Sequence, residues 1–465
     1  MAGDPHGLLP IHTLTFASLR RSLLLGVWLC AWTVPLYAQP SEIREPDERQ
    51  IAPEAQKGEP TTAKPEEKKA LEAFFHRGAY TFIPLPAFSY ARNERYWIGA
   101  FMPVLKEDQK GELSTIIAPQ YLFNPLVGQT GTINIFRYPS DTAQYELTAS
   151  LSERIARDID FRYKDVGAGG GRYIVGLQAT WFKNPFERFF GFGNRAQELR
   201  ETNFTLREGR VNLMLGINLN PDLAITLTER YRDVRIQQGV IDTLPQTKDV
   251  FSQVSGIEGA QILGHRLALV SDTRDHQRTP TKGTYVTLSG EFNQNLLHAD
   301  ESQWFRYTLD GRTLIPHGNG RFVFVPHILL DGVVGDELQT LPRGTSQHRG
   351  IPFYERPMLG GENTLRAFGQ NRFISNTAML VNIEERILIK EVLIMDYAID
   401  VQVAPFLDVG RVQQQSPGDK FNLKNWQVNP GLGLRIMAKP HIVGRADFAI
   451  GLDGFNAFVG VDYPF

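Results

Sequence analysis

Residues 211 to 222 read V-N-L-M-L-G-I-N-L-N-P-D. Apolar and mostly polar or small side chains alternate along this stretch: Val211, Leu213, Leu215, Ile217 and Leu219 against Asn212, Met214, Gly216, Asn218 and Asn220. A period of two places the apolar set on one face of a β-strand and the other set on the opposite face. Asn220-Pro221-Asp222 is typical of a tight turn. The stretch therefore predicts a two-faced strand followed by a turn.

The same pattern recurs from Thr81 to the end of the chain. Near the C-terminus, Ala446, Phe448, Ile450 and Leu452 would face outward, and Arg445, Asp447, Gly451 and Asp453 inward. At about 24 residues for a membrane strand with its share of loops, roughly 380 residues predict about sixteen strands. A soluble β-sandwich would show the same period, so alternation alone leaves both fold classes open.

The N-terminus favours a membrane barrel over a soluble β-sandwich. Residues 1–38 are expected to be a signal peptide, with Arg20 and Arg21 before an apolar run that ends at Ala38. The only cysteine, Cys30, would leave with it, which excludes disulfides and cysteine metal sites in the mature chain. Together with the aromatic C-terminus, these features favour an all-β transmembrane antiparallel β-barrel in a bacterial outer membrane.

Composition indicates how the mature chain is divided and which partners and cofactors it excludes. Residues 39–78 are expected to be a disordered or short-helical periplasmic leader, and residues 79–465 the barrel. The 49 basic and 51 acidic residues nearly cancel, which argues against nucleic acid as a partner. The mean hydropathy of −0.25 suits outward apolar residues that alternate with inward polar ones. The ten histidines show no metal-ligand spacing, so neither a metal nor a cofactor is expected.

One long loop carries the strongest candidate site. Residues 357–373 read P-M-L-G-G-E-N-T-L-R-A-F-G-Q-N-R-F, in which Gly360 and Gly361 permit tight turns. Arg366 lies between Leu365 and Phe368. In a narrow enclosure its five donors would require carboxylate partners, and Glu384 and Asp408 follow on strand-like runs. We expect these three charged residues to latch the loop to the wall; the alternative is a solvated loop cation.

These motifs resemble the BamA/TamA-like bacterial surface antigen superfamily. Leu365-Arg366-Ala367-Phe368 is similar to the tip of its long loop, and Phe406-Leu407-Asp408-Val409-Gly410 to its wall motif, with Phe406 and Gly410 at the ends. Further similarities are residues 271–275 with 280–283, residues 382–386, and Gly460-x-x-Tyr463-x-Phe465. The family usually has glycine where this chain has Ala367. If that position required a positive φ, alanine would cost about 1 kcal/mol.

The resemblance implies a long inward-folded loop and a role in the insertion or translocation of polypeptide, or of lipid, through a weak barrel seam. The implied partners are outer-membrane lipid and lipopolysaccharide, the barrel assembly machinery, and an unidentified periplasmic protein. Gly460, Tyr463 and Phe465 would form the assembly signal, with this chain as a client of that machinery. The leader is too short for one polypeptide-transport-associated domain, so the expectation is a member that lacks them.

Prolines point to the position of the seam. Pro84 and Pro86 lie in the first candidate strand and Pro464 in the last, and none can donate a ladder hydrogen bond. They weaken the closure or, alternatively, protect strand ends from misplaced pairing. A passive pore or structural barrel with a loop constriction remains the alternative function. No enzyme is expected, because Ser346 and His348 lack the second glycine of a nucleophile elbow.

Overall fold

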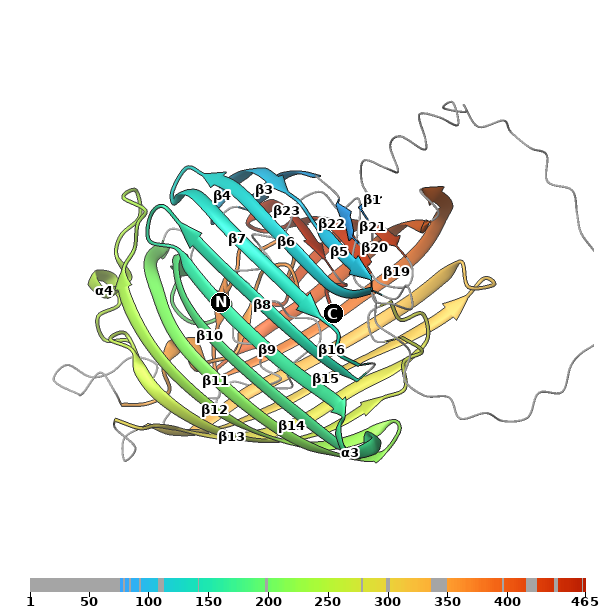
Figure 1. The fold of residues 1–465 in the computed structure, drawn as a ribbon. Coiled ribbons are helices and arrows are strands. Elements are labelled where there is room, and N and C mark those ends of the chain that lie inside the picture. Colours follow the sequence, from blue (N-terminus) through green and yellow to red (C-terminus); the bar gives the residue numbers. More distant parts are fainter. Residues whose placement is uncertain are drawn as a thin grey trace, which may run out of the picture.

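A computed structural model of the protein describes residues 76–77, 80–82, 85–91, 93–107, 113–140, 142–196, 200–276, 279–297, 302–335, 349–394, 397–414, 425–438, 442–461 and 463–465 (Figure 1). The expected signal peptide, nearly all of the expected leader, Pro84, Ser346 and His348 lie outside these residues. No helix in the described ranges is long and apolar enough to span a membrane.

One antiparallel sheet of 21 strands curves round into a barrel (Figure 1). Its first strands are β1 (His76–Arg77), β2 (Tyr80–Phe82), β3 (Leu85–Ala91), β4 (Arg95–Phe101), β5 (Val104–Glu107), β6 (Leu113–Asn124), β7 (Gly128–Arg137), β8 (Ala143–Ser152), β9 (Arg157–Gly167) and β10 (Tyr173–Phe189). The others are β11 (Thr202–Asn220), β12 (Leu223–Gln238), β13 (Ala260–Asp272), β14 (Gly283–Asn295), β15 (Gln303–His317), β16 (Phe322–Gly335), β19 (Thr377–Ile394), β20 (Tyr397–Gln413), β21 (Gln427–Ala438), β22 (Ile442–Gly451) and β23 (Gly454–Val461). The predicted fold class is confirmed.

Short elements interrupt the wall or lie in its connections. Two short helices, α3 (Ala168–Gly171) and α4 (Thr247–Val250), lie between strands. The loop between β16 and β19 contains the 3-10 helix η2 (Phe353–Glu355) and a small hairpin of β17 (Met358–Leu359) and β18 (Phe373–Ile374). β2 pairs with β5, and β3 with β4. β2 and β3 therefore form one interrupted strand of the wall, and β4 and β5 form the next. With these two pairs merged, 19 of the 21 strands remain, so the estimate of about sixteen strands is slightly low.

Side chains alternate across the wall as the sequence predicts. On β11, Leu213 and Leu215 are 53% and 62% exposed, whereas Asn212 and Met214 are 5% and 1% exposed. An apolar outward face and an inward face of mostly hydrogen-bonding groups are the arrangement expected of a barrel that stands in lipid. Near the C-terminus, Phe448 and Ile450 are exposed while Asp447 is buried, so the second predicted strand is also confirmed.

The two ends of the barrel differ in the length of their connections. β11 and β12 are joined by two residues, whereas β16 and β19 are joined by the long loop at the opposite end. In outer-membrane barrels the short turns face the periplasm and the long loops face outward. The periplasmic turn between β13 and β14 is held by Asp275, whose carboxylate accepts hydrogen bonds from the backbone and hydroxyl of Thr281 at 2.9 and 2.6 Å.

The barrel closes between two short strands, β3 and β23. β3 has seven residues and β23 has eight, against 19 in β11 and 17 in β20. The two lie side by side (Figure 1). β3 pairs with β4, and β23 pairs with β22. No hydrogen-bonded ladder joins the described residues of β3 to those of β23. Pro86 lies in β3 opposite Ala100, where its ring nitrogen has no hydrogen to donate.

The prediction that Pro464 lies in the last strand is wrong. β23 ends at Val461, and Pro464 is buried in a tail that leaves the wall. The phenyl ring of Phe465 stacks on the imidazole of His327 with centroids 4.8 Å apart, and the Arg386 guanidinium lies 3.3 Å from the Tyr463 ring centroid. These contacts inside the barrel decide where the strand ends, and no local sequence pattern encodes them.

Candidate functional site: a lumenal loop held by ion networks

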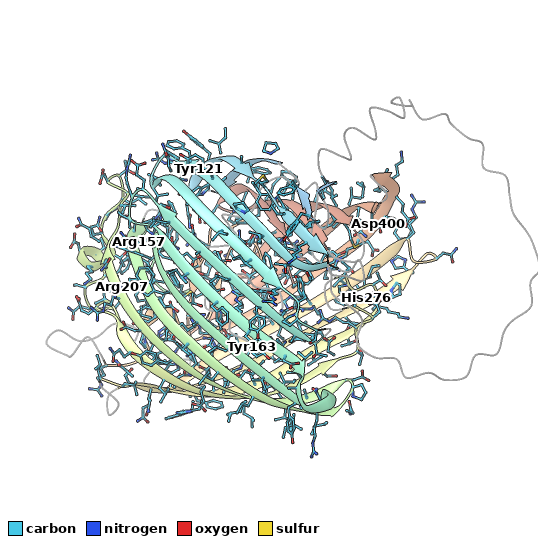
Figure 2. The ribbon with its side chains drawn as sticks, viewed as in Figure 1. Tyr121, Arg157, Tyr163, Arg207, His276 and Asp400 are labelled. Carbon is cyan, nitrogen blue, oxygen red and sulfur yellow. The ribbon has the colours of Figure 1, made fainter. Side chains whose placement is uncertain are left out.

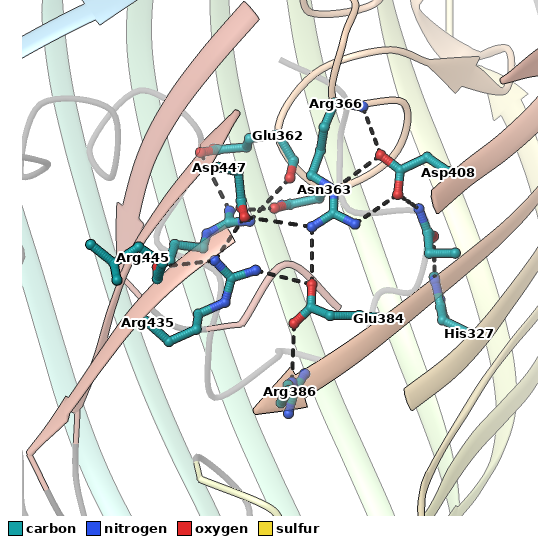
Figure 3. A network of polar contacts seen from close by, with 12 residues as sticks. His327, Glu362, Asn363, Arg366, Glu384, Arg386, Asp408, Arg435, Arg445 and Asp447 are labelled. Carbon is teal, nitrogen blue, oxygen red and sulfur yellow. Dashed lines mark hydrogen bonds and ion pairs between the residues drawn. The ribbon is translucent and has the colours of Figure 1, made fainter. Parts of the chain in front are cut away.

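The described part of the loop between β16 and β19, residues 349–376, folds into the barrel and is fixed at Arg366 (Figure 3). The guanidinium binds Asp408 on β20 in a bidentate manner, with Nε to Oδ2 at 3.0 Å and Nη2 to Oδ1 at 2.7 Å. Its Nη1 donates to Glu384 Oε2 on β19 at 3.0 Å. All three side chains are fully buried. The structure thus brings together the three charged residues that the sequence singled out.

The protonation of Arg366 follows from these neighbours. Burial alone would lower the pKa of its guanidinium, but the carboxylates of Asp408, Asp447 and Glu384 outweigh burial and raise that pKa above its ordinary value. The side chain therefore stays charged. Its Cζ atom lies 3.3 Å from the ring centroid of Phe406, so the wall motif supplies an aromatic face as well as a carboxylate.

Further charges surround the latch and nearly balance one another. Glu384 also accepts hydrogen bonds from Arg386 Nε at 3.1 Å and from Arg435 Nη2 at 3.0 Å. Asp447 accepts from Arg435 and Arg445 at 2.7 and 3.1 Å. The network contains Arg366, Arg386, Arg435 and Arg445 against Asp408, Glu384, Asp447 and Glu362. Buried charges are tolerated where they are paired in this way.

Asn382 connects the latch, formed by Arg366, Asp408 and Glu384, to the C-terminal residue of the chain. Its Nδ2 donates to Asp408 Oδ1 at 2.7 Å and to the backbone oxygen of Thr364 at 3.0 Å. Its Oδ1 lies 2.8 Å from His327 Nδ1. Phe465 covers the His327 ring, and the Phe465 ring centroid lies 5.7 Å from Arg366 Cζ. The C-terminal residue therefore packs beside the latch in the folded barrel.

The loop backbone uses glycine where chain segments approach closely. Gly360 and Gly361 adopt φ of 114° and 102°, which disfavours other residues. Gly410 on β20 leaves room for the loop, because a Cβ there would lie 3.1 Å from Leu359 Cδ1. Ala367 is not among the described residues with positive φ, so alanine carries no backbone cost there. Its methyl group instead faces Gly451 on β22.

We expect Gly451→Ala to destabilise the barrel and Ala367→Gly to restore it. A methyl group at position 451 would lie 2.8 Å from the Ala367 Cβ, so the loop or the wall would have to move, at a cost of about 1–3 kcal/mol. The urea midpoint in detergent should fall for the single variant and recover in the double variant. Gly131→Ala is the control, because nothing lies within 4 Å of its added methyl group.

A second anchor lies earlier in the same loop, at Glu355. Arg230 on β12 donates to Glu355 Oε1 and Oε2 at 3.0 and 2.9 Å, and Arg232 also bonds the carboxylate. Arg230 in turn bonds Glu291, and Arg232 bonds Glu208, each at 2.7 Å. The adjacent Phe353 and Tyr354 pack in the large apolar cluster with Phe189, Phe204 and Ile236.

This anchor could not be predicted from the sequence. Glu355 is 125 residues from Arg230 in the chain, and only the alternation of Arg230 and Arg232 on one strand face hinted at an inward cationic site. Burial alone would raise the pKa of the Glu355 carboxyl, but Arg230 and Arg232 outweigh burial and hold that pKa well below its ordinary value. Glu355 and Arg366 together tie the loop to wall strands β12 and β20.

This pKa shift predicts a pH-dependent contribution from Glu355. Because the folded-state pKa is depressed, the stabilisation is complete above the unfolded pKa of about 4.3 and is lost as pH falls toward the folded value. The difference in unfolding temperature between wild type and Glu355→Gln should therefore be constant near pH 7 and shrink below about pH 4.3. Glu258→Gln, in an exposed pair with Lys248, should differ little from wild type at either pH.

The end of the loop reaches the last hairpin. Arg372 Nε donates to Asp453 Oδ2 at 2.6 Å, in the turn between β22 and β23. Asn456 Nδ2 on β23 donates to the backbone oxygen of Phe368 at 3.2 Å. The segment from Phe368 to Arg372 therefore contacts the strand that borders the closure of the barrel. The remaining loop-motif residue, Leu365, is fully buried in the apolar cluster that also holds Leu359 and Phe406.

Fold and site define the class of protein. A closed antiparallel wall with an apolar outer face, and a long loop latched inside by an arginine, describe an outer-membrane β-barrel with an inward-folded loop. The profile of the Omp85 superfamily domain matches residues 142–455, which is more than half of the chain. The chain belongs to the Omp85 superfamily, and its location is the bacterial outer membrane.

Several solved structures match this chain at low sequence identity. BamA from Haemophilus ducreyi lacking POTRA domains 1–3 matches at 12% identity and a TM-score of 0.49, over 85% of this chain and 76% of that one. CdiB from Escherichia coli matches at 12% identity and 0.46, over 83% and 63%. CdiB from Acinetobacter baumannii matches at 10% identity and 0.38, over 82% and 59%. A comparison with curated proteins finds no match.

Proposed function

We propose that this barrel inserts or translocates polypeptide, or lipid, through the junction between β3 and β23. The observation that carries the proposal is the weak closure of the barrel at this junction. Both strands are short, and no hydrogen-bonded ladder joins their described residues. An edge with unpaired backbone groups can pair with another chain. Among the described residues, opening this junction therefore breaks fewer ladder hydrogen bonds than opening a long pair such as β10 and β11.

The loop supports the same proposal because it touches both sides of the junction. Phe368 is bonded to Asn456 on β23. Its neighbour Gly369 lies beside Asn93, in the turn between β3 and β4, since a Cβ on Gly369 would be 3.3 Å from Asn93 Oδ1. In this proposal the Arg366 latch and the Glu355 anchor hold the loop, and the loop keeps the two edges in position until a substrate separates them.

In this proposed function the chain has no catalytic role, and its partners are lipid and other proteins. The machinery that assembles outer-membrane barrels would recognise Gly460, Tyr463 and Phe465 in the unfolded chain, because Phe465 is later packed against Leu314, Val323 and Val325 inside the barrel. Outer-membrane lipid would contact the apolar outer face. A periplasmic protein would deliver the substrate.

The test uses liposomes that contain the purified protein and, as probe, a urea-unfolded eight-stranded outer-membrane barrel. We expect the probe to fold into these liposomes several-fold faster than into protein-free liposomes, as read from its shift on unheated gels. An unchanged rate would oppose a role in polypeptide insertion. In planar bilayers, large steady openings that persist in Arg366→Ala would instead favour a passive pore.

A further inference from the structure

Four basic side chains form a row across neighbouring strands β9 to β12. Arg157 is the cross-strand partner of Lys183, Lys183 of Arg207, and Arg207 of Arg235. Cross-strand partners on one face have Cβ atoms about 4.5–5.5 Å apart. The row therefore places four like charges side by side, although the whole chain has a formal net charge of only −2.

The row faces outward. Phe182 and Glu208, which adjoin Lys183 and Arg207 along the chain, are fully buried inside the barrel, so alternation points the two cations away from the lumen. Arg157 is exposed, and the Arg235 side chain is 57% exposed. Figure 2 shows Arg157 and Arg207 near the same end of the strands.

That end is the extracellular one. Arg157 begins β9, and the other three residues lie three to six residues from the ends of β10, β11 and β12 that lead into the connections β10–β11 and β12–β13. These connections are at the end of the barrel that carries the long loop. Toward the other end of the same strands, the outer face becomes apolar, with Ile159 on β9 and Leu213 on β11 about half exposed. The row thus lies at the extracellular border of the lipid-facing band.

Acidic side chains compensate the row only weakly. Asp233 Oδ2 lies 3.9 Å from Arg235 Nε. Within the described part of the chain, no ion pair joins Arg157, Lys183 or Arg207 to a carboxylate. Like charges directly opposite one another destabilise a sheet, so the row is most stable when an external anion binds it.

We propose that this row binds the phosphate groups of a phosphorylated outer-leaflet lipid of the lipid A class. The guanidinium groups suit phosphate oxygens, and the exposed apolar side chains below them would contact the acyl chains. At about 4.8 Å between strands the row spans roughly 15 Å, so one lipid with two phosphates can meet separate pairs of cations. A second copy of the chain, docked through the same face, would bring one row against the other. This site is independent of the function proposed for the seam.

The test is native mass spectrometry of the full chain in detergent with bis-phosphorylated lipid A as the probe. The double variant Lys183→Gln/Arg207→Gln removes two cations and should weaken binding roughly thirtyfold. The single variant Lys183→Gln should weaken binding roughly fivefold, and it serves as the test if the double variant does not fold. The matched control is Arg172→Gln/Lys282→Gln, which removes two exposed cations at the periplasmic end and should leave the affinity unchanged.

The arms of the experiment distinguish lipid from other anions. Dephosphorylated lipid A should bind wild type no better than it binds the double variant. Equal affinities of wild type and both Lys183 variants for bis-phosphorylated lipid A would overturn the site. Full competition by soluble inositol hexakisphosphate at matched phosphate concentration would show a general polyanion site and overturn the assignment to lipid.

Discussion

Arg366→Ala is expected to lower the stability of the folded barrel by about 3–5 kcal/mol, the cost of removing one partner from a buried ion pair. The substitution leaves Asp408 without its bidentate partner, and Glu384 with two of its three cations. The unfolding temperature read from gel mobility and the yield of refolding in detergent should both fall clearly.

Two variants separate the latch from a general effect of losing an arginine. Arg366→Lys keeps the charge but not the bidentate geometry, so we expect an intermediate loss. Arg172→Ala, at an exposed position, should resemble wild type. If Arg366→Ala unfolded at the wild-type temperature, the contacts of Arg366 would not stabilise the barrel, and the proposed latch would be removed from the account.

The second large effect is expected for Glu355→Ala. Arg230 and Arg232 would keep Glu291 and Glu208 but lose the carboxylate between them, at a cost of about 3 kcal/mol. The free energy of unfolding in urea measures the loss. Glu258→Ala, on the exposed surface, is the matched control and should change it by less than about 0.5 kcal/mol.

The double variant Glu355→Ala/Arg366→Ala tests whether the anchors act separately. The described ion pairs of Glu355 and those of Arg366 share no residue, so their effects should add to within about 0.5 kcal/mol. A double variant no less stable than Arg366→Ala would mean that Glu355 contributes only while the latch is formed.

Local chemistry explains what the sequence could predict. A wall between lipid and a polar lumen imposes a period of two, so the outward direction of Leu213 and Leu215 follows once the N-terminus and C-terminus favour a membrane barrel. Arg366 needed carboxylates, and the resemblance indicated which strands supply them. Glu384 and Arg386 share the inward face, whereas Glu385 pairs outside with His317, as alternation requires.

Long-range packing explains what the sequence could not predict. Nothing near Glu355 in the chain specifies Arg230 as its partner, because the loop must first fold into the lumen. Pro464 could not be placed, because the docking of Phe465 on His327 draws the tail off the wall. The alanine at position 367 fits because Gly451 faces it, a compensation 84 positions away that no local pattern reveals.

The most direct test of the proposed function locks the junction between β3 and β23. Ala87→Cys would be combined in turn with a cysteine at each position from 457 to 461, and each pair oxidised and then reduced in the liposome assay with the unfolded eight-stranded barrel. The account predicts that a crosslinked junction abolishes the acceleration of folding and that reduction restores it. A barrel that is fully crosslinked and still accelerates folding at the wild-type rate would contradict passage through this junction.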